Sequence, residues 1–192
     1  IANGIAGKRG ATLVRPYDDP FVIAGQGTVG REIAEDMTAL GLAPDIVVAP
    51  ASGGGLIAGV ATAVKAKFPQ AQVIVAEPKD YDDHGLSLRA GHREAHHAAG
   101  RTICDALMAA MPGEMTFSIN SKLLANGVIA SDEEVGAAVA YAYRELKLVV
   151  EPGGAVGLAA LLAGRIDAKG KNVVIVLSGG NVDADLFAKL VA

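Results

Sequence analysis

The sequence contains little cysteine and little net charge, and no long apolar run. Cys104 is the one cysteine among 192 residues, which excludes a disulfide framework and a metal site built from several cysteines. The 17 Lys and Arg against 21 Asp and Glu give a formal net charge of −4, whereas nucleic-acid binding needs a basic stripe. No run approaches the roughly 20 apolar residues of a membrane-spanning helix. We therefore expect a cytoplasmic protein that binds neither nucleic acid nor a membrane.

Short runs rich in valine and isoleucine alternate with helical patterns. Strands are predicted at Ala11–Val14, Asp45–Ala49, Gln72–Ala76 and Asn172–Leu177. Helices are predicted at about Thr28–Leu40, Gly55–Lys67, Asp132–Lys147, Gly154–Leu162 and Val182–Leu190. Runs that are apolar on both faces suit a parallel sheet covered by helices on both sides. The fold class predicted is α/β, with a doubly wound and mostly parallel sheet. The segment from Asp80 to Asn126 fits this alternation least well.

The first glycine cluster has the G-x-G-x-x-G spacing, at Gly25, Gly27 and Gly30. Taken alone, this spacing indicates a dinucleotide site, and hence a nicotinamide-dependent oxidoreductase. Its context is poor, because the preceding strand would be only Phe21–Ala24 and the next predicted strand runs into Pro50 rather than an acidic residue. A tight turn before a helix is the alternative interpretation.

The second cluster is Ser52-Gly53-Gly54-Gly55-Leu56, directly after a predicted buried strand and before a predicted helix. Consecutive glycines let the backbone approach a ligand closely, and their N–H groups together with the helix N-terminus favour an anion. We therefore predict that this loop binds phosphate. It is not a Walker loop, because no Lys-Ser or Lys-Thr follows.

The third cluster, Ser178-Gly179-Gly180-Asn181, also follows a predicted strand. Ligands of open α/β sheets bind at the carboxyl ends of the strands. Two such turns at one crevice predict a ligand with a phosphate at one end and a hydrogen-bonding ring at the other. Two unrelated turns are the alternative.

These clusters occur together with two further motifs, Glu77-Pro78 and Glu151-Pro152-Gly153-Gly154-Ala155. In order and spacing the set resembles the pyridoxal-phosphate-dependent threonine/serine dehydratases and serine racemases, which are enzymes of fold type II. The resemblance runs from about Lys8 to the C-terminus. One departure is Ala106, where the family usually has a glycine near the cofactor.

The resemblance implies roles for the two loops. Ser52, Gly53, Gly54, Gly55 and Leu56 match the loop that holds the phosphate of pyridoxal 5'-phosphate, and Ser178 matches the residue at the pyridine nitrogen. A hydroxyl there makes the ring a weaker electron sink than a carboxylate would, which suits β-elimination. The implied reaction converts L-threonine, L-serine or a related β-hydroxy amino acid to ammonia and a 2-oxo acid. A serine or hydroxyaspartate racemase or ammonia-lyase is the alternative.

The resemblance also implies a divalent-cation site. Glu77 and Asp83 match its two carboxylates, and the peptide carbonyl of Tyr81 matches the ligand between them. Oxygen ligands of this kind suit Mg²⁺, Ca²⁺ or Mn²⁺. A solvated acidic turn is the alternative interpretation.

The family's Schiff-base lysine lies in a Ser-Phe-Lys type motif that this sequence does not contain. The sequence also starts, at Ile1, in the middle of a helical pattern. We therefore expect residues 1–192 to form a single α/β cofactor-binding domain that is the C-terminal portion of a dehydratase, without the N-terminal part and the small domain. Such a chain would be inactive alone, because covalent attachment and proton transfer depend on that lysine.

Two further expectations concern alternatives and assembly. A non-catalytic module that binds a phosphate or a nucleotide through the glycine loop would also explain Ser52–Leu56.

The many apolar residues, together with the family's dimers, lead us to expect a homodimer. Cys104 lies in a mostly apolar stretch, so we predict a small buried residue there rather than a nucleophile.

Overall fold

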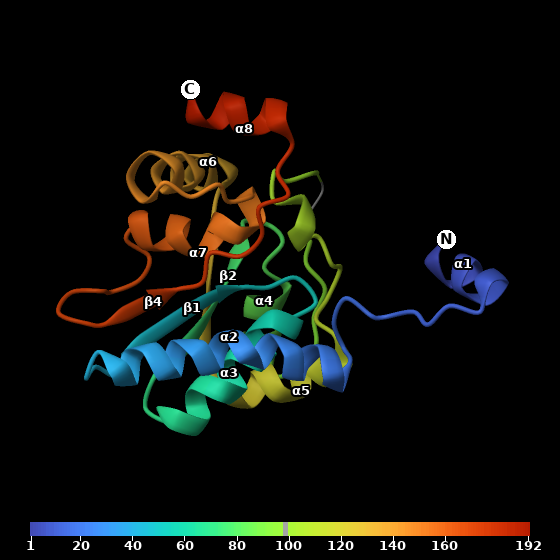
Figure 1. Cartoon of the computed structure of the whole chain (residues 1–192), viewed down its shortest axis with the longest axis horizontal. Helices are drawn as coiled ribbons and strands as arrows, with labels where there is room; N and C mark the ends of the chain where they lie inside the picture. Colours follow the sequence, from blue (N-terminus) through green and yellow to red (C-terminus); the bar gives the residue numbers. More distant parts are fainter. Residues whose placement is uncertain (98–99) are drawn as a thin grey trace.

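A parallel four-stranded sheet forms the centre of the protein (Figure 1), as described by a computed structural model for residues 1–97 and 100–192. The strand order is β3-β2-β1-β4. The strands are β1 (Ile46–Pro50), β2 (Gln72–Pro78), β3 (Leu124–Ala130) and β4 (Val173–Ile175). The chain builds outward from β1 to β3 and then returns to add β4 on the other side of β1. This reversal confirms the predicted doubly wound sheet and places the switch point between β1 and β4.

Helices cover both faces of the sheet (Figure 1). One layer consists of α2 (Pro20–Ala39), α3 (Gly55–Lys67) and α5 (Glu114–Leu123), and the opposite layer of α6 (Asp132–Tyr141), α7 (Pro152–Leu162) and α8 (Ala184–Val191). The helix α4 (Asp83–Ala90) follows β2, and a π-helical turn, Ala142–Leu146, extends α6. The helix α1 (Ala2–Arg9) stands away from this body and buries none of its residues.

Alternate residues of each central strand supply the two hydrophobic cores. In β1, Val47 packs with the cluster on the α3 side and Val48 with the cluster on the α7 side, and both are fully buried. In β2, Val75 and Ala76 divide in the same way. The strands therefore need apolar residues at every position, which is why they read as continuous valine and isoleucine runs.

Three of the departures from the predicted elements bear on the site. Residues 11–14 form no strand and are exposed. The sequence Leu124–Ala130 is β3, an edge strand that begins within the segment that fitted least well. Phe21–Ala24, the short strand that the dinucleotide interpretation would need, lies at the start of α2 instead. Asp19 caps that helix through Phe21 N and Val22 N, and Pro20 occupies its first position.

The correction at α2 removes the basis of the dinucleotide interpretation. Gly25, Gly27 and Gly30 lie inside a helix, so they do not form a strand-to-helix turn. Gly27 and Gly30 face α3 and let the two helices approach: a Cβ atom on Gly30 would lie 2.5 Å from the carbonyl oxygen of Val60, and one on Gly59 would lie 2.5 Å from Gly27 N. Gly25 has no atom within 4 Å of its Cβ position. The glycine spacing thus serves close helix packing.

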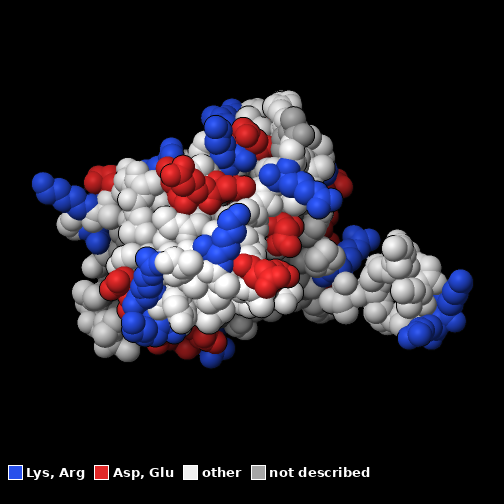
Figure 2. Space-filling model, turned by 90° about the horizontal axis from the view of Figure 1, so that it is seen from above, with Lys and Arg blue, Asp and Glu red and all other residues white. Residues whose placement is uncertain are grey.

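Charged side chains of both signs lie on the surface of the protein. Basic and acidic side chains are interspersed over the face shown in Figure 2, without a continuous basic stripe on that face. Within the described ranges, no helix combines the length and the apolar character that crossing a bilayer requires.

Two glycine substitutions within α2 test the packing role. Gly30→Ala should lower the free energy of unfolding by about 1–3 kcal/mol, because the added methyl group overpacks the contact with α3. Gly25→Ala should raise it by about 0.5–1 kcal/mol, because nothing lies within 4 Å of the new Cβ atom and alanine favours a helix. Urea denaturation of both variants measures the difference. Equal changes would contradict the assignment.

Candidate functional site

Three chain segments that carry candidate site residues leave the carboxyl edge of the sheet. Ser52–Leu56 follows β1, Glu77 and Pro78 end β2, and Ser178 follows β4. Since parallel strands end at one edge, these segments lie close together next to the switch point. The predicted site residues are therefore brought to one side of the molecule.

The glycine loop points the N-terminus of α3 at this edge. Gly54 is the N-cap of α3 and has a φ of +94°, a left-handed conformation that favours glycine. No side chain among the described residues caps this helix end, so its first N–H groups face outward. A Cβ atom on Gly53 would overlap the Tyr17 ring, and one on Gly54 would overlap His84 Nε2. Side chains are excluded here, and the backbone itself forms the surface.

The carbonyl groups of the loop are held from α5. Thr116 Oγ1 donates to the Gly53 carbonyl at 2.6 Å, and Gly113 N donates to the same oxygen at 3.1 Å. Asp18 in turn fixes the start of α5, since its Oδ1 accepts from Met115 N at 2.7 Å and from Thr116 N. These bonds hold the Gly53 carbonyl toward α5, which leaves the N–H groups of the loop for a ligand.

All six residues predicted to bind the cofactor line one pocket of about 510 Å³. These are Ser52, Gly53, Gly54, Gly55, Leu56 and Ser178. Tyr17 lines it as well, and so does the 3₁₀ turn Asp105–Leu107, which includes Ala106. Ser52 Oγ accepts from Ala109 N at 3.1 Å, which ties the loop to the opposite wall. The pocket is therefore lined by the backbone N–H groups of the glycine loop and by the residue Ser178, which carries a hydroxyl group.

The loop after β4 is positioned by the other glycine-rich motif. Glu151 Oε2 accepts from Asn181 N at 3.0 Å, and Glu151 N donates to the Gly179 carbonyl at 3.2 Å. A Cβ atom on Gly154 would overlap the Ser178 carbonyl oxygen. The motif Glu151-Pro152-Gly153-Gly154-Ala155 therefore holds the loop after β4 in the position that places Ser178 at the pocket.

A larger hollow, of about 1150 Å³, runs along α2, α3 and α5. Its surface is mostly apolar, and the charged Arg31 and Glu35 on it form an exposed i,i+4 pair with each other. It holds none of the residues predicted to bind the cofactor or the cation. Sites for polar ligands need convergent polar groups, so the smaller pocket is the candidate functional site.

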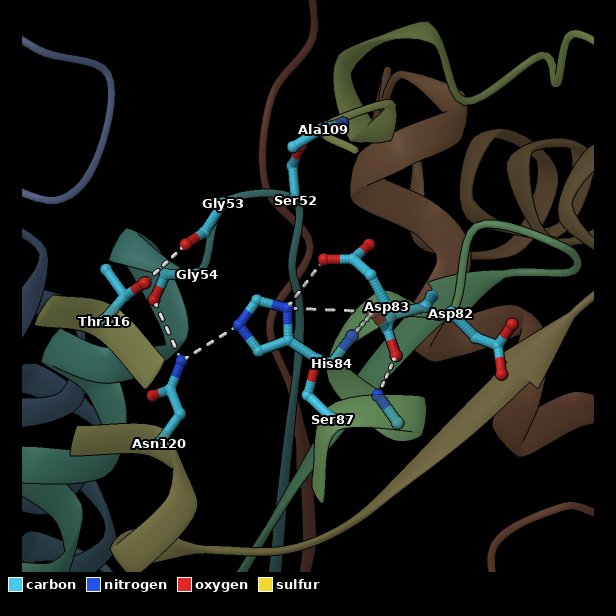
Figure 3. Close-up of polar contacts among 12 residues, drawn as sticks. Ser52, Gly53, Gly54, Asp82, Asp83, His84, Ser87, Ala109, Thr116 and Asn120 are labelled. Carbon is cyan, nitrogen blue, oxygen red and sulfur yellow. Dashed lines mark hydrogen bonds and ion pairs between the residues drawn. The ribbon is translucent and has the colours of Figure 1, made fainter. Parts of the chain in front are cut away.

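A buried carboxylate cluster lies beside the glycine loop. Glu77, Asp83 and His84 offer ligand atoms that all lie within 4.8 Å of one another, and all three side chains are buried. Figure 3 shows Asp83 and His84 next to each other. Burial and the neighbouring Asp83 carboxylate raise the pKa of Glu77 well above its ordinary value, against hydrogen bonds from His84 N and Gly85 N. Tyr81 is buried nearby at the turn, where its N–H donates to the Pro78 carbonyl.

Comparison with known proteins places this geometry in a family. The sequence model of the family described as "Pyridoxal-phosphate dependent enzyme" matches residues 1–179. The chain belongs to the pyridoxal-phosphate-dependent enzyme family. Its helix N-terminus, glycine cradle and Ser178 hydroxyl fit a ligand with a phosphate and a ring nitrogen.

Among curated relatives, the chain is 40% identical over 185 residues to an L-threonine ammonia-lyase of Thermotoga maritima. It is 39% identical over 183 residues to the L-threonine dehydratase catabolic TdcB of Staphylococcus aureus. These matches cover 96% and 93% of the chain but 44% and 51% of the relatives. The chain thus spans about half the length of the curated relatives that it matches.

Solved structures in the family share the fold. A threonine deaminase from T.th. superposes with a TM-score of 0.88 at 40% identity, over 95% of this chain and 61% of that one. A maize serine racemase superposes with a TM-score of 0.86 at 35% identity, over 97% of this chain and 56% of that one. The expected α/β fold of this family is therefore confirmed.

Sequence reasoning missed several residues that build the site. They are Tyr17, Asp18, His84, Thr116 and Asn120. Only Asp18 carried a signal, as an acidic residue in a Pro-rich turn, and its partners on α5 lie 97 and 98 residues away. The others are single residues whose role depends on tertiary contacts.

Cys104 lies next to the pocket but is fully buried. Burial raises the pKa of its thiol to about 12. Because the folded protein holds this proton more tightly than the unfolded chain, the thiol's contribution to stability declines as the pH rises from about 9 toward 12. The predicted role as a small buried residue is confirmed.

Thiol reactivity provides the test. At pH 8 the folded protein should react with a thiol reagent such as DTNB about 1000-fold more slowly than the chain in guanidinium chloride, because so little thiolate is present. Absorbance at the product band measures both rates. Reaction of the folded protein at the unfolded rate would show that the thiol is accessible.

Proposed function

We propose that this chain forms the cofactor-phosphate-binding part of a pyridoxal-phosphate-dependent ammonia-lyase that acts on L-threonine or L-serine. The observation that carries the proposal is the shared pocket, in which the uncapped N-terminus of α3 and the Ser178 hydroxyl face one volume. Identity of about 40% to an L-threonine ammonia-lyase and an L-threonine dehydratase supports the reaction class.

In this proposal the backbone N–H groups of Gly53–Leu56 bind the phosphate of the cofactor. The positive end of the α3 dipole adds to the attraction, and the left-handed Gly54 lets the loop close around the anion. Thr116 and Asp18 keep the loop carbonyls turned away from the phosphate. The loop therefore anchors one end of the cofactor without a positively charged side chain.

Ser178 contacts the ring nitrogen at the other end. When bound, pyridoxal phosphate supplies an electron sink that acidifies the α-proton of an amino acid. A hydroxyl at the ring nitrogen donates or accepts a hydrogen bond but does not hold a full positive charge there, in contrast to a carboxylate. This moderate effect favours loss of a β-hydroxyl group over reactions that need a long-lived carbanion.

The Schiff-base lysine belongs to a motif that these 192 residues do not contain. In the proposal it comes from a further part of the protein, and residues 1–192 are one cofactor-binding domain of that protein. A cytoplasmic homodimer, with a divalent cation held by Glu77, Asp83 and the Tyr81 carbonyl, completes the proposal. The two orphaned buried atoms Asp83 Oδ2 and His84 Nδ1 support a cation at that cluster.

A racemase is the second candidate, because a maize serine racemase at 35% identity has nearly the same fold. It uses the same pocket and the same cofactor contacts, and it differs only in the fate of the substrate. The products therefore distinguish the two: a 2-oxo acid for the lyase and the D-amino acid for the racemase.

Turnover of the protein encoded by the reading frame that contains this chain tests the proposal. With pyridoxal phosphate and L-threonine or L-serine, it should form a 2-oxo acid, measured by coupled reduction. Ser178→Ala should lower kcat about tenfold, the effect of losing one hydrogen bond. Ser121→Ala, at an exposed position on α5, is the matched control and should leave kcat unchanged. No 2-oxo acid from either substrate would overturn the lyase proposal.

A further inference from the structure

The cluster beside the glycine loop contains a nitrogen donor that the oxygen-only cation site lacks. We propose that His84 Nδ1 is a ligand of the cation site formed by Glu77 and Asp83, which therefore takes a first-row transition-metal dication such as Mn²⁺ or Zn²⁺ in preference to Ca²⁺ or Mg²⁺. This inference goes beyond the lyase proposal and rests only on this chain's own side chains.

The distances match ligands of one ion better than direct contacts. His84 Nδ1 lies 3.6 Å from Asp83 Oδ2 and 3.8 Å from Glu77 Oε1. Charge-assisted hydrogen bonds would shorten these separations to about 2.7–2.9 Å. Two ligand atoms that each lie about 2.0–2.2 Å from a shared ion are about 3–4.4 Å apart. The three atoms thus surround a space in which an ion fits.

Two of these atoms are orphaned in a fully buried position. Asp83 Oδ2 and His84 Nδ1 are buried and have no hydrogen-bond partner among the described residues. Glu77 differs, since both of its oxygens accept backbone N–H groups, which fixes its carboxylate in place. Buried polar groups without partners are costly, and two adjacent carboxylates repel each other. A bound dication removes both costs at once.

Asn120 determines which nitrogen of the His84 ring carries the hydrogen. Its amide lies 3.2 Å from His84 Nε2, on the side of the ring away from the carboxylates (Figure 3). Its Oδ1 is also buried and without a partner within the described chain. The amide nitrogen also donates to the Gly54 carbonyl, over a long 3.4 Å. Rotation of the amide by about 180° gives up that long bond, exchanges the nitrogen and the oxygen, and brings Oδ1 to Nε2, which then donates its hydrogen to Oδ1. The lone pair is left on Nδ1, as in metal-bound histidines whose second nitrogen donates to an oxygen.

The ligand set determines the class of ion. Imidazole nitrogen suits Zn²⁺ and the other later first-row dications, whereas Ca²⁺, Mg²⁺ and, to a lesser degree, Mn²⁺ favour oxygen ligands. Two carboxylates and one imidazole also leave positions for the Tyr81 carbonyl or water. Affinity should therefore rise from Mg²⁺ and Ca²⁺ through Mn²⁺ to Zn²⁺.

Pulsed electron paramagnetic resonance of Mn²⁺ added to the purified protein tests the ligand directly. A ¹⁴N coupling typical of a directly bound imidazole is the expected result. His84→Gln should abolish this coupling and weaken Mn²⁺ binding at least about tenfold, with a much smaller change for Ca²⁺. His92→Gln, at a histidine with 69% of its side chain exposed, is the matched control and should change neither.

The wild-type spectrum decides the question even if the His84 variant fails to fold. Bound Mn²⁺ without ¹⁴N coupling would overturn the proposal in favour of an oxygen-only site, and absence of Mn²⁺ and Zn²⁺ binding would overturn it altogether. Asn120→Leu gives a second check, since loss of the acceptor for Nε2–H should weaken Mn²⁺ binding about tenfold. The readout needs no catalysis, so it is independent of whether the protein is a lyase.

Discussion

The turn from β1 into α3 depends on Gly54, which takes a left-handed conformation in a space that His84 and Asn120 leave too small for a Cβ atom. This single constraint points the N-terminus of α3 into the pocket. It also brings the glycine loop against α5, where Thr116 binds the Gly53 carbonyl. That close approach of backbone to side chain sets the proposed anion-binding surface and the pocket wall, and it places the carboxylate cluster beside them.

The sheet supports this turn by its topology. Because β4 adds to β1 on the side opposite β2, the loops after β1 and β4 meet at the switch point. Glu151 and Gly154 then seat the Ser178 loop through backbone contacts. The two ends of the pocket are therefore positioned by different parts of the fold, one by α3 and α5 and the other by α7.

Local sequence patterns predicted the elements that are buried on both faces of the sheet. They failed where contacts between distant residues determine the structure. β1, β2 and α3 were predictable because strands buried on both sides must be apolar throughout. β3 was missed because Asn126 and Gly127 interrupt its apolar pattern at the edge of the sheet. The strand predicted at Ala11–Val14 was wrong: those residues are exposed and pair with no strand in the part of the chain that the structure describes. In α2, glycines that serve helix packing looked like a turn, although Asp19 and Pro20 mark a helix start.

The same distinction holds at the site. The glycine loop and Ser178 were predictable because their motifs are contiguous and follow strands. His84 and Asn120 lie 36 residues apart, and neither belongs to a pattern that short-range reasoning detects.

A structure determined with pyridoxal 5'-phosphate bound tests the central claim most directly. The account predicts phosphate oxygens about 2.7–3.2 Å from the backbone nitrogens of Gly54, Gly55 and Leu56. A phosphate held elsewhere, with the glycine loop empty, would contradict it.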